Sequence, residues 1–369
     1  MKRTGKFFTG FALFLLAACG NAASTEENLA RIKLPPGFAI SIYAEGLAGP
    51  RQLALGDQGT VFAGSNKAGT VYAVVDGDSN YLADGTYVVA SGLQLSAGVE
   101  FRFGSLYVGA LDQILRYDDI ESSLDQPPPP EVITSTLPDR THHGKRYLRF
   151  GPDDFLYFGV GAPCNVCLEP GFGQIRRMYA DGSGEEVFVS GVRNSVGIVF
   201  NPADGSMWFT DNGRDMLGDD IPSDELNHVT QAGQDFGFPY CHQGDLLDPQ
   251  FGEGKSCADY TPPAVMMGPH VAALGLAFNN GDMFPAEYRG ALFIARHGSW
   301  NRSEKIGYDL AVVRFDAEGQ PLEAEVFASG WLQGQSAWGR PADVMQLPDG
   351  SLLVSDDAAD VIYRISYSD

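Results

Sequence analysis

Basic residues are scarce in this chain of 369 residues. It has 25 Lys and Arg against 47 Asp and Glu, which gives a formal net charge of −22. Nucleic-acid binding depends on a basic surface that contacts phosphates, so this charge argues against a nucleic-acid partner. An acidic chain is compatible with cation sites, but the charge alone predicts only solubility.

Long amphipathic helical patterns are missing as well. No long stretch has apolar residues at helical spacing. Short segments instead alternate Val, Phe and Tyr with polar residues, as in FAISIYA (38–44), and the chain contains 45 glycines. This combination is typical of an all-β protein.

One short phrase recurs six times: a turn rich in Gly, Asp and Pro, a strand-length apolar run, and then a polar cluster. The copies lie at residues 56–66, 103–112, 151–161, 201–213, 288–298 and 347–357. A continuous apolar run predicts a strand buried on both faces. The repeat predicts a six-bladed β-propeller with four-stranded blades. We interpret the six runs as the inner strands, whose polar ends converge on one face.

The two ends of the chain are predicted to close the ring. Residues 361–367 (VIYRISY) follow the sixth copy, and the strand at 38–44 is left to complete the last blade. Such closure removes an exposed sheet edge. Residues 34–369 are therefore predicted to form a single propeller domain, which is the catalytic domain if the protein is an enzyme.

The N-terminus reads as an export signal. It opens with three basic residues, Lys2, Arg3 and Lys6. The apolar run at 7–16 is too short to span a bilayer. Cys19 follows Leu-Ala-Ala, which resembles the bacterial lipobox. The resemblance implies a signal peptide at 1–18, a lipidated Cys19 and a tether at 19–33, hence a lipid-anchored periplasmic protein. Gly20 favours the inner face of the outer membrane. Cleavage nearby without lipidation is the alternative.

Cysteines are few, and four of the five follow Cys19. An even number after an export signal favours two disulfides. Nearness in sequence suggests Cys164–Cys167 and Cys241–Cys257, although three pairings are possible. A redox or zinc site at C-x-x-C is the alternative. No second C-x-x-C lies nearby, and a redox role for the first pair stays open.

Cationic residues gather in polar segments beside the predicted strands. His142 and His143 are adjacent, near Arg140, Lys145 and Arg146. A His has a pKa near neutrality and can act as a general base, or it can be a loop residue with no role.

Further along, three Arg residues occupy comparable places. Arg193 precedes one apolar run and Arg340 another, while His297, Trp300 and Arg302 lie in HGSWNR (297–302). A guanidinium suits a carboxylate or a quinone oxygen, and an indole can stack on a ligand. A surface ion pair is the alternative. Together with the His pair, these residues predict a cationic pocket for an anionic, planar ligand.

An oxygen-rich segment follows the fourth apolar run. It begins at TDNGRD (210–215) and continues to Asp224 and Glu225. Carboxylates and backbone carbonyls are the ligands that calcium prefers, although the spacing is not that of an EF-hand. A solvated acidic loop is the alternative.

In order and spacing, these segments resemble the soluble pyrroloquinoline-quinone (PQQ)-dependent sugar dehydrogenases, and in particular their sorbosone dehydrogenase-like branch. The resemblance covers nearly the whole mature chain. It rests on HHGKRYLRFGPDDFLYFGVGAPCNVC, GVRNSVGIVFNP, WFTDNGRDMLGDD, SDELN, YRGALFIARHGSWNR and GRPADVMQLPDGSLLVSDD. It implies a six-bladed propeller enzyme that oxidises a sugar hydroxyl or aldehyde such as sorbosone, with PQQ and Ca²⁺ as cofactors and hydride transfer to the quinone.

The resemblance also implies roles for individual residues. His143 matches the general base, although the H-x-G spacing of some relatives selects His142. Arg193 and Asn194 match a cofactor-binding pair, and Arg340 matches a later cofactor-binding Arg.

Other family positions differ in this chain. The carbonyls of Gly213 and Arg214 match those that hold the calcium. A second Arg of some relatives is replaced by Ala342, and a quinone-contacting Lys has no clear equivalent, its place being taken by residues 297–302.

Two other functions remain open from the sequence. A calcium-dependent propeller hydrolase, such as a lactonase, needs several acidic side chains in the channel and no Arg pair. A binding propeller without catalysis is favoured by the missing Lys and by Ala342. The expected partners of a dehydrogenase are a sugar and an electron acceptor, either a cytochrome or the quinone pool. The sequence does not identify the sugar, the acceptor or the oligomeric state.

Overall fold

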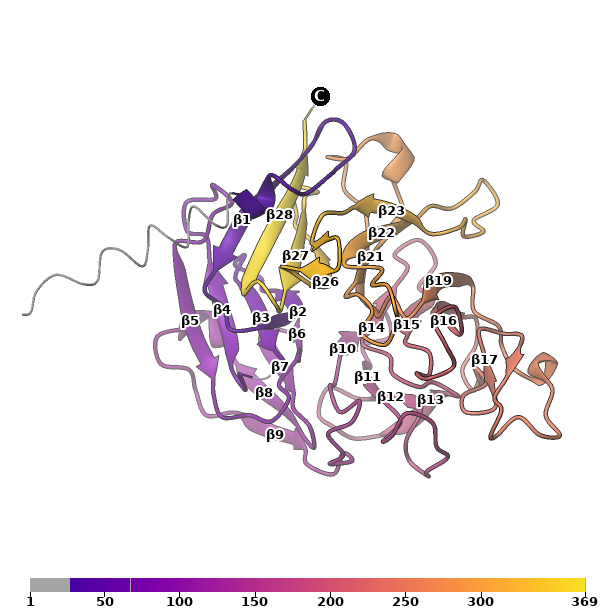
Figure 1. Cartoon of the computed structure of the whole chain (residues 1–369). Coiled ribbons are helices and arrows are strands. Elements are labelled where there is room, and N and C mark those ends of the chain that lie inside the picture. The colour runs from indigo at the N-terminus through magenta and orange to yellow at the C-terminus, as the bar shows by residue number, and fades with distance from the viewer. Residues whose placement is uncertain (1–26, 67, 369) are drawn as a thin grey trace, which may run out of the picture.

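The computed structural model describes residues 27–66 and 68–368 and is almost entirely β-structure (Figure 1). Within these residues, six four-stranded antiparallel sheets are arranged as the blades of a propeller. The predicted fold class is therefore confirmed. The predicted signal peptide, Cys19 and most of the predicted tether lie outside the described residues.

Each of the first three blades is formed by four strands that follow one another in sequence. The first contains β2 (Pro50–Leu55), β3 (Val61–Ser65), β4 (Val71–Val75) and β5 (Gly85–Ala90). The second contains β6 (Gly98–Arg102), β7 (Ser105–Gly109), β8 (Ile114–Asp118) and β9 (Glu131–Thr134). The third contains β10 (Leu148–Phe150), β11 (Leu156–Val160), β12 (Gln174–Met178) and β13 (Glu186–Ser190).

The next two blades follow the same order, with an excursion in the fourth. The fourth contains β14 (Gly197–Phe200), β15 (Met207–Asp211), β16 (Ser223–Val229) and β19 (Val265–Pro269). The fifth contains β20 (Ala273–Phe278), β21 (Leu292–Arg296), β22 (Asp309–Val313) and β23 (Glu325–Ala328). Between β16 and β19 lie a hairpin, β17 (Cys241–His242) with β18 (Leu246–Leu247), and the 3₁₀ helix η2 (Cys257–Asp259).

Both ends of the chain build the sixth blade. β1 (Phe38–Glu45) pairs with β28 (Val361–Tyr367), which pairs with β27 (Leu352–Asp356) and then β26 (Pro341–Gln346). In Figure 1 the indigo β1 lies beside the yellow β28. The predicted closure of the ring by the N-terminal strand is confirmed.

The repeat of the sequence forms the second strand of each blade, not the inner one. β2, β6, β10, β14, β20 and β26 contact one another in turn around the axis. The repeated apolar runs are β3, β7, β11, β15, β21 and β27, one strand further out. The interpretation of these runs as inner strands is wrong, because second strands are covered by neighbouring blades and are buried on both faces just as inner strands are.

The predicted convergence of polar groups survives this shift. Because first and second strands are antiparallel, the start of one lies beside the end of the other. Pro50 of β2 is opposite Ser65 of β3, and Pro341 of β26 is opposite Asp356 of β27. Residues that precede the inner strands and residues that follow the second strands therefore meet at the same mouth of the channel.

Two disulfides tie loops that lie outside the blade strands. Cys241 pairs with Cys257 and closes the excursion of the fourth blade, and Cys164 pairs with Cys167 in the loop after β11. Both pairings agree with those suggested by nearness in sequence.

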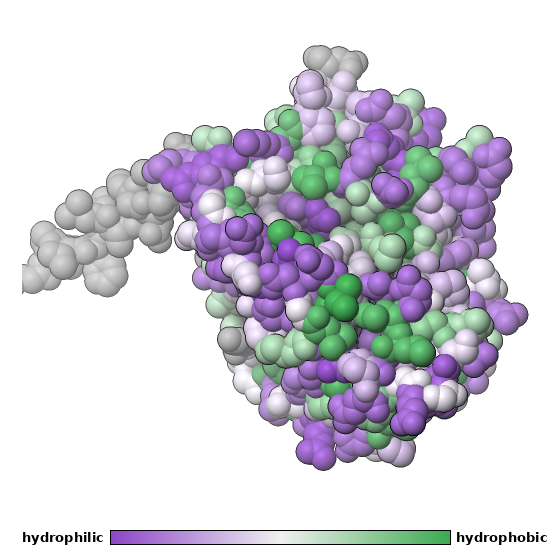
Figure 2. All heavy atoms as spheres, turned by 45° about the vertical axis from the view of Figure 1, so that its right-hand side comes forward, coloured by the Kyte–Doolittle hydropathy of each residue, from purple (hydrophilic) through white to green (hydrophobic). Residues whose placement is uncertain are grey.

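The surface reflects the acidic composition. Hydrophilic residues cover much of the face in Figure 2, and hydrophobic residues gather in separate patches. In the described part of the chain, no helix has the length and apolar character needed to cross a membrane.

Candidate active site

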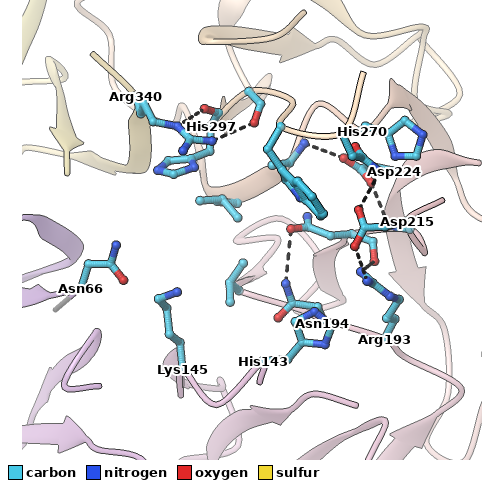
Figure 3. A pocket seen from close by; sticks show the side chains of 18 of the residues that line it. Asn66, His143, Lys145, Arg193, Asn194, Asp215, Asp224, His270, His297 and Arg340 are labelled. Atoms are coloured by element: carbon cyan, nitrogen blue, oxygen red, sulfur yellow. Dashed lines mark hydrogen bonds and ion pairs between the residues drawn. The ribbon is translucent and has the colours of Figure 1, made fainter. Parts of the chain in front are cut away.

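A polar cavity of about 300 Å³ lies at the mouth where the inner strands begin (Figure 3). Among the described residues, its wall carries four side chains of Lys and Arg type and two carboxylates. These are Arg51, Lys145, Arg193, Arg340, Asp215 and Asp224. A site with more cationic than anionic groups in an otherwise acidic protein is suited to an anionic ligand.

His143 lines the cavity from the loop that precedes β10. Its Nδ1 lies 2.9 Å from the carbonyl oxygen of Ala162. Because a carbonyl only accepts, Nδ1 carries the proton and Nε2 keeps its lone pair. Burial, and then the nearby Arg193 guanidinium, hold the pKa of His143 well below its usual value. His143 is thus neutral at pH 7 and able to accept a proton.

His142 is exposed and does not line the cavity, although the two imidazole rings are 4.1 Å apart. The structure therefore favours His143 over His142 as the group that faces a ligand.

The Arg193 guanidinium is held by oxygen atoms on several sides. Nε donates to the Asn165 carbonyl at 2.8 Å, and Nη1 donates to the Asn212 carbonyl at 3.0 Å. Nη2 lies 2.9 Å from both the Asn165 side chain and the Asp215 carboxylate. Arg193 is only 3% exposed, so its orientation at the cavity is fixed.

Arg340 reaches the same cavity from the start of the sixth blade. Its Nε and Nη2 each donate at 2.9 Å, to the carbonyls of His297 and Gly298. Its backbone N–H donates to the buried Asp356 carboxylate at 2.7 Å. These contacts link the loop after β21 to the entry of β26.

His297 forms an imidazole–carboxylate pair, across the cavity from His143 (Figure 3). Its Nε2 lies 2.6 Å from Asp357 Oδ1, and Arg51 Nη1 donates to the other oxygen of Asp357 at 2.8 Å. Burial lowers the pKa of His297 to about 4, which the Asp357 carboxylate only partly opposes. Arg51 and His297 hold the pKa of Asp357 well below its usual value despite its burial.

The oxygen-rich side of the cavity is provided by Gly213 and Asp224. The two oxygens of Asp224 accept the backbone N–H groups of Gly213 at 2.8 Å and Ala272 at 2.6 Å. Burial raises the pKa of Asp224 to about 7. A cation at this side would favour its ionised form.

Three predicted ligand positions do not line the cavity. Glu225 follows Asp224 in β16, and successive strand residues point to opposite faces. Its carboxylate accepts the Gln243 N–H at 2.8 Å instead. Arg214, whose carbonyl was the predicted ligand, is not among the wall residues, and its guanidinium pairs with the buried Asp248. Arg302 donates to the Asp219 carbonyl.

Asn194 and Trp300 complete the predicted positions at the wall. Asn194 N–H is fixed by Asp211 at 2.5 Å, whereas Trp300 is 65% exposed. A large exposed indole beside a polar cavity is available to cover a planar ligand.

Sequence reasoning missed several residues of the wall. Arg51, Asn66 and His270 were not singled out, and Lys145 was noted only as part of a basic cluster. Arg51 carried a usable signal: it stands at the start of an inner strand, as Arg193 and Arg340 stand shortly before theirs.

Comparisons with known proteins agree on one family. Residues 129–364 match the sequence model of the family described as Glucose / Sorbosone dehydrogenase. An uncharacterized protein of Borreliella burgdorferi is 31% identical over 96% of this chain and 95% of its own length. A pyrroloquinoline quinone-dependent sugar dehydrogenase of Hypocrea jecorina is 22% identical over 96% of this chain and 92% of its own.

Solved structures show the same fold. The holo PQQ domain of a pyranose dehydrogenase from Coprinopsis cinerea superposes with a TM-score of 0.78 at 19% identity. The match covers 91% of this chain and 97% of that domain.

Proposed function

This chain belongs to the glucose/sorbosone dehydrogenase family, and on that premise we propose that it is a PQQ- and calcium-dependent dehydrogenase that oxidises a sugar. The names of the Hypocrea and Coprinopsis proteins, both of which refer to PQQ, support the choice of cofactor. A related Trichoderma reesei structure described as a calcium structure supports the choice of metal.

The observation that carries the proposal is the cationic wall opposite a neutral imidazole. PQQ is a planar tricarboxylate, and the cavity offers Arg193, Arg340 and Arg51 together with Lys145. Guanidinium groups bind carboxylates with directed hydrogen bonds. The cavity volume of about 300 Å³ is at the lower end of the range of small-molecule sites, roughly 300–1,000 Å³. The residues present therefore fit an anionic quinone.

The residues also fit a hard cation. Calcium takes oxygen ligands, and Gly213 and Asp224 provide them at one side of the cavity. Burial makes the Asp224 carboxylate costly to ionise. A cation bound beside it would offset that cost.

The chemistry divides between cofactors and protein. When bound, the quinone accepts the two electrons of the oxidation as a hydride equivalent and calcium polarises it as a Lewis acid. His143 accepts the substrate hydroxyl proton at Nε2, because Nδ1 already donates to Ala162. Arg193 and Arg340 offset the negative charge of the carboxylates of the quinone. Their hydrogen bonds to backbone carbonyls keep the two guanidinium groups aligned, so neither has to reorganise during the reaction.

Reconstitution tests the proposal directly. The purified apoprotein is given calcium and PQQ, and reduction of an artificial dye is followed with a panel of aldoses and sugar aldehydes. We expect dye reduction that requires both additions. Lactone hydrolysis without the quinone would favour the hydrolase instead. The absence of both activities, with no PQQ-dependent rise in melting temperature, would identify a binding propeller.

We also propose a lipid-anchored, periplasmic location, supported by the N-terminal sequence and by two disulfides, which persist in oxidising compartments. Fatty-acid labelling of the full chain should be lost in Cys19→Ala, and labelling of that variant equal to wild type would contradict the anchor.

A further inference from the structure

The short loop closed by Cys164 and Cys167 lies directly behind the cavity wall. The two cysteines are three residues apart, and the ring they close contains Asn165 and Val166. The loop follows β11 and belongs to no strand. Its contacts are with two residues that line the cavity, Arg193 and Asp215.

Asn165 uses both its backbone and its side chain for these contacts. Its carbonyl accepts Arg193 Nε at 2.8 Å, and its Oδ1 accepts Arg193 Nη2 at 2.9 Å. The same Oδ1 accepts the Asp215 N–H at 2.8 Å, and Nδ2 donates to the Asp215 carbonyl at 3.1 Å. Since Arg193 Nη2 also pairs with the Asp215 carboxylate, the three residues form a closed set of contacts.

The preceding residues connect the loop to the candidate base. Ala162 N–H donates to the Arg193 carbonyl at 2.8 Å. The Ala162 carbonyl is the partner of His143 Nδ1. A single stretch of five residues, 162–166, thus contacts the Arg193 guanidinium, the backbone of Asp215 and the His143 imidazole.

We propose that Asn165 is a positioning residue for Arg193, and that the Cys164–Cys167 disulfide keeps Asn165 in place. The reason is geometric. A guanidinium on a long side chain has several rotamers, and two parallel hydrogen bonds from Nε and Nη2 select one. A loop outside any sheet needs another constraint to hold its two acceptor oxygens, and a short covalent ring limits its freedom. The disulfide then links ligand affinity at the wall to the redox state of the loop.

The identity of the ligand rests on the proposed function, so the test has one readout with the quinone and one without it. The first is the Kd of PQQ for the calcium-loaded protein, from quenching of tryptophan fluorescence without turnover. The second is hydrogen exchange of the Arg193 Nε–H in the apoprotein by ¹⁵N–¹H NMR, assigned with Arg193→Lys.

Four variants separate positioning from general stability. Asn165→Ala removes the side-chain contacts, and Cys164→Ser/Cys167→Ser removes the disulfide. Val166→Ala, in the same loop, and Cys241→Ser/Cys257→Ser, in the other disulfide, are the matched controls.

We expect Asn165→Ala and Cys164→Ser/Cys167→Ser each to raise the Kd about tenfold, since each frees a charged hydrogen-bonded group. Combining them should raise it little further, because both act on one set of contacts. Exchange of the Arg193 Nε–H should quicken in both variants and in neither control.

An unchanged Kd in Asn165→Ala, or fully additive effects, would overturn the proposal. If the wild-type protein binds no PQQ, the proposed function fails, and the exchange measurement alone decides on the positioning role.

Discussion

The tautomer of His143 depends on one main-chain contact. The Ala162 carbonyl fixes the proton on Nδ1, and burial keeps the ring neutral. A base of this kind needs no further group to deprotonate it at pH 7.

His143→Ala should lower kcat by about 10²- to 10⁴-fold, the usual contribution of a general base. Calcium binding should change little, because Asp224 lies on another side of the cavity from His143 (Figure 3). His142→Ala is the control, since His142 is exposed. Steady-state kinetics of the reconstituted protein measure both. If His142→Ala were the inactive variant, the assignment would pass to that residue.

Asp343 makes the stability of the folded protein depend on pH. Its buried carboxylate accepts the Leu53 N–H at 2.7 Å and the Tyr147 hydroxyl at 3.1 Å. Burial raises the pKa of Asp343 to about 7, above the value of about 3.9 expected in the unfolded chain. The folded state therefore binds more protons between these two values, and this contribution to stability is lost as the pH rises from about 4 through 7.

Asp343→Asn should remove that contribution to the pH dependence. An amide oxygen still accepts the Leu53 N–H, and its NH₂ donates to the Tyr147 oxygen. We expect the variant to have nearly the wild-type melting temperature at pH 5 and to be more stable at pH 8, by on the order of 5 °C. Thermal unfolding without calcium at both pH values measures this. Parallel curves for the two proteins would contradict the raised pKa.

Several residues of the cavity wall could be predicted from the sequence, but the complete set of wall residues could not. His143, Arg193 and Arg340 stand in polar segments that interrupt apolar runs, and such segments are visible in sequence. Arg51 was missed because it stands alone within PRQLAL, which reads as a strand. Glu225 was grouped with Asp224 because sequence neighbours look equivalent until the alternation of the strand separates their side chains.

At the scale of elements, β1 is the strand on which ring closure depends. Phe38 packs edge-on against rings from the fifth and sixth blades, with centroids 4.8 Å from Phe284, 5.0 Å from Phe327 and 4.9 Å from Tyr367. These aromatic contacts join a strand from one end of the chain to the core of two blades.

Phe38→Ala should lower the free energy of unfolding by about 2 kcal/mol, below the full cost for a completely buried Phe because the side chain is partly exposed. Ser41→Ala on the same strand, at an exposed position, should change it by less than about 0.5 kcal/mol. Chemical denaturation compares the two. Equal effects would show that β1 contributes through backbone pairing alone.

The number of blades was easier to predict from the sequence than the position of each strand within its blade. The six copies of the turn and apolar run gave the correct number of blades, since each blade contains one such strand. They did not show which strand faces the axis, because inner and second strands share the same burial. Only the contacts among the first strands of the blades reveal the axis.

At the scale of the molecule, repetition allowed most of the architecture to be predicted. Each copy of the recurring pattern buries the same kind of surface against its neighbours. Six such units can therefore pack side by side and close into a ring. The long interval between Trp208 and Leu292 breaks this regularity. Its disulfide was suggested by the nearness of Cys241 and Cys257 in sequence, whereas its hairpin, β17 with β18, was not predicted.

Ring closure also brings distant parts of the chain together. Arg51, near the start of the first blade, and Asp357, directly after β27 of the last blade, are 306 residues apart in sequence, and their side chains are 2.8 Å apart. Their contact closes a very long loop, so its formation carries a large entropy cost of loop closure. Because Arg51 and Arg340 both line the cavity, its complete wall exists only in a chain synthesised at least as far as Arg340.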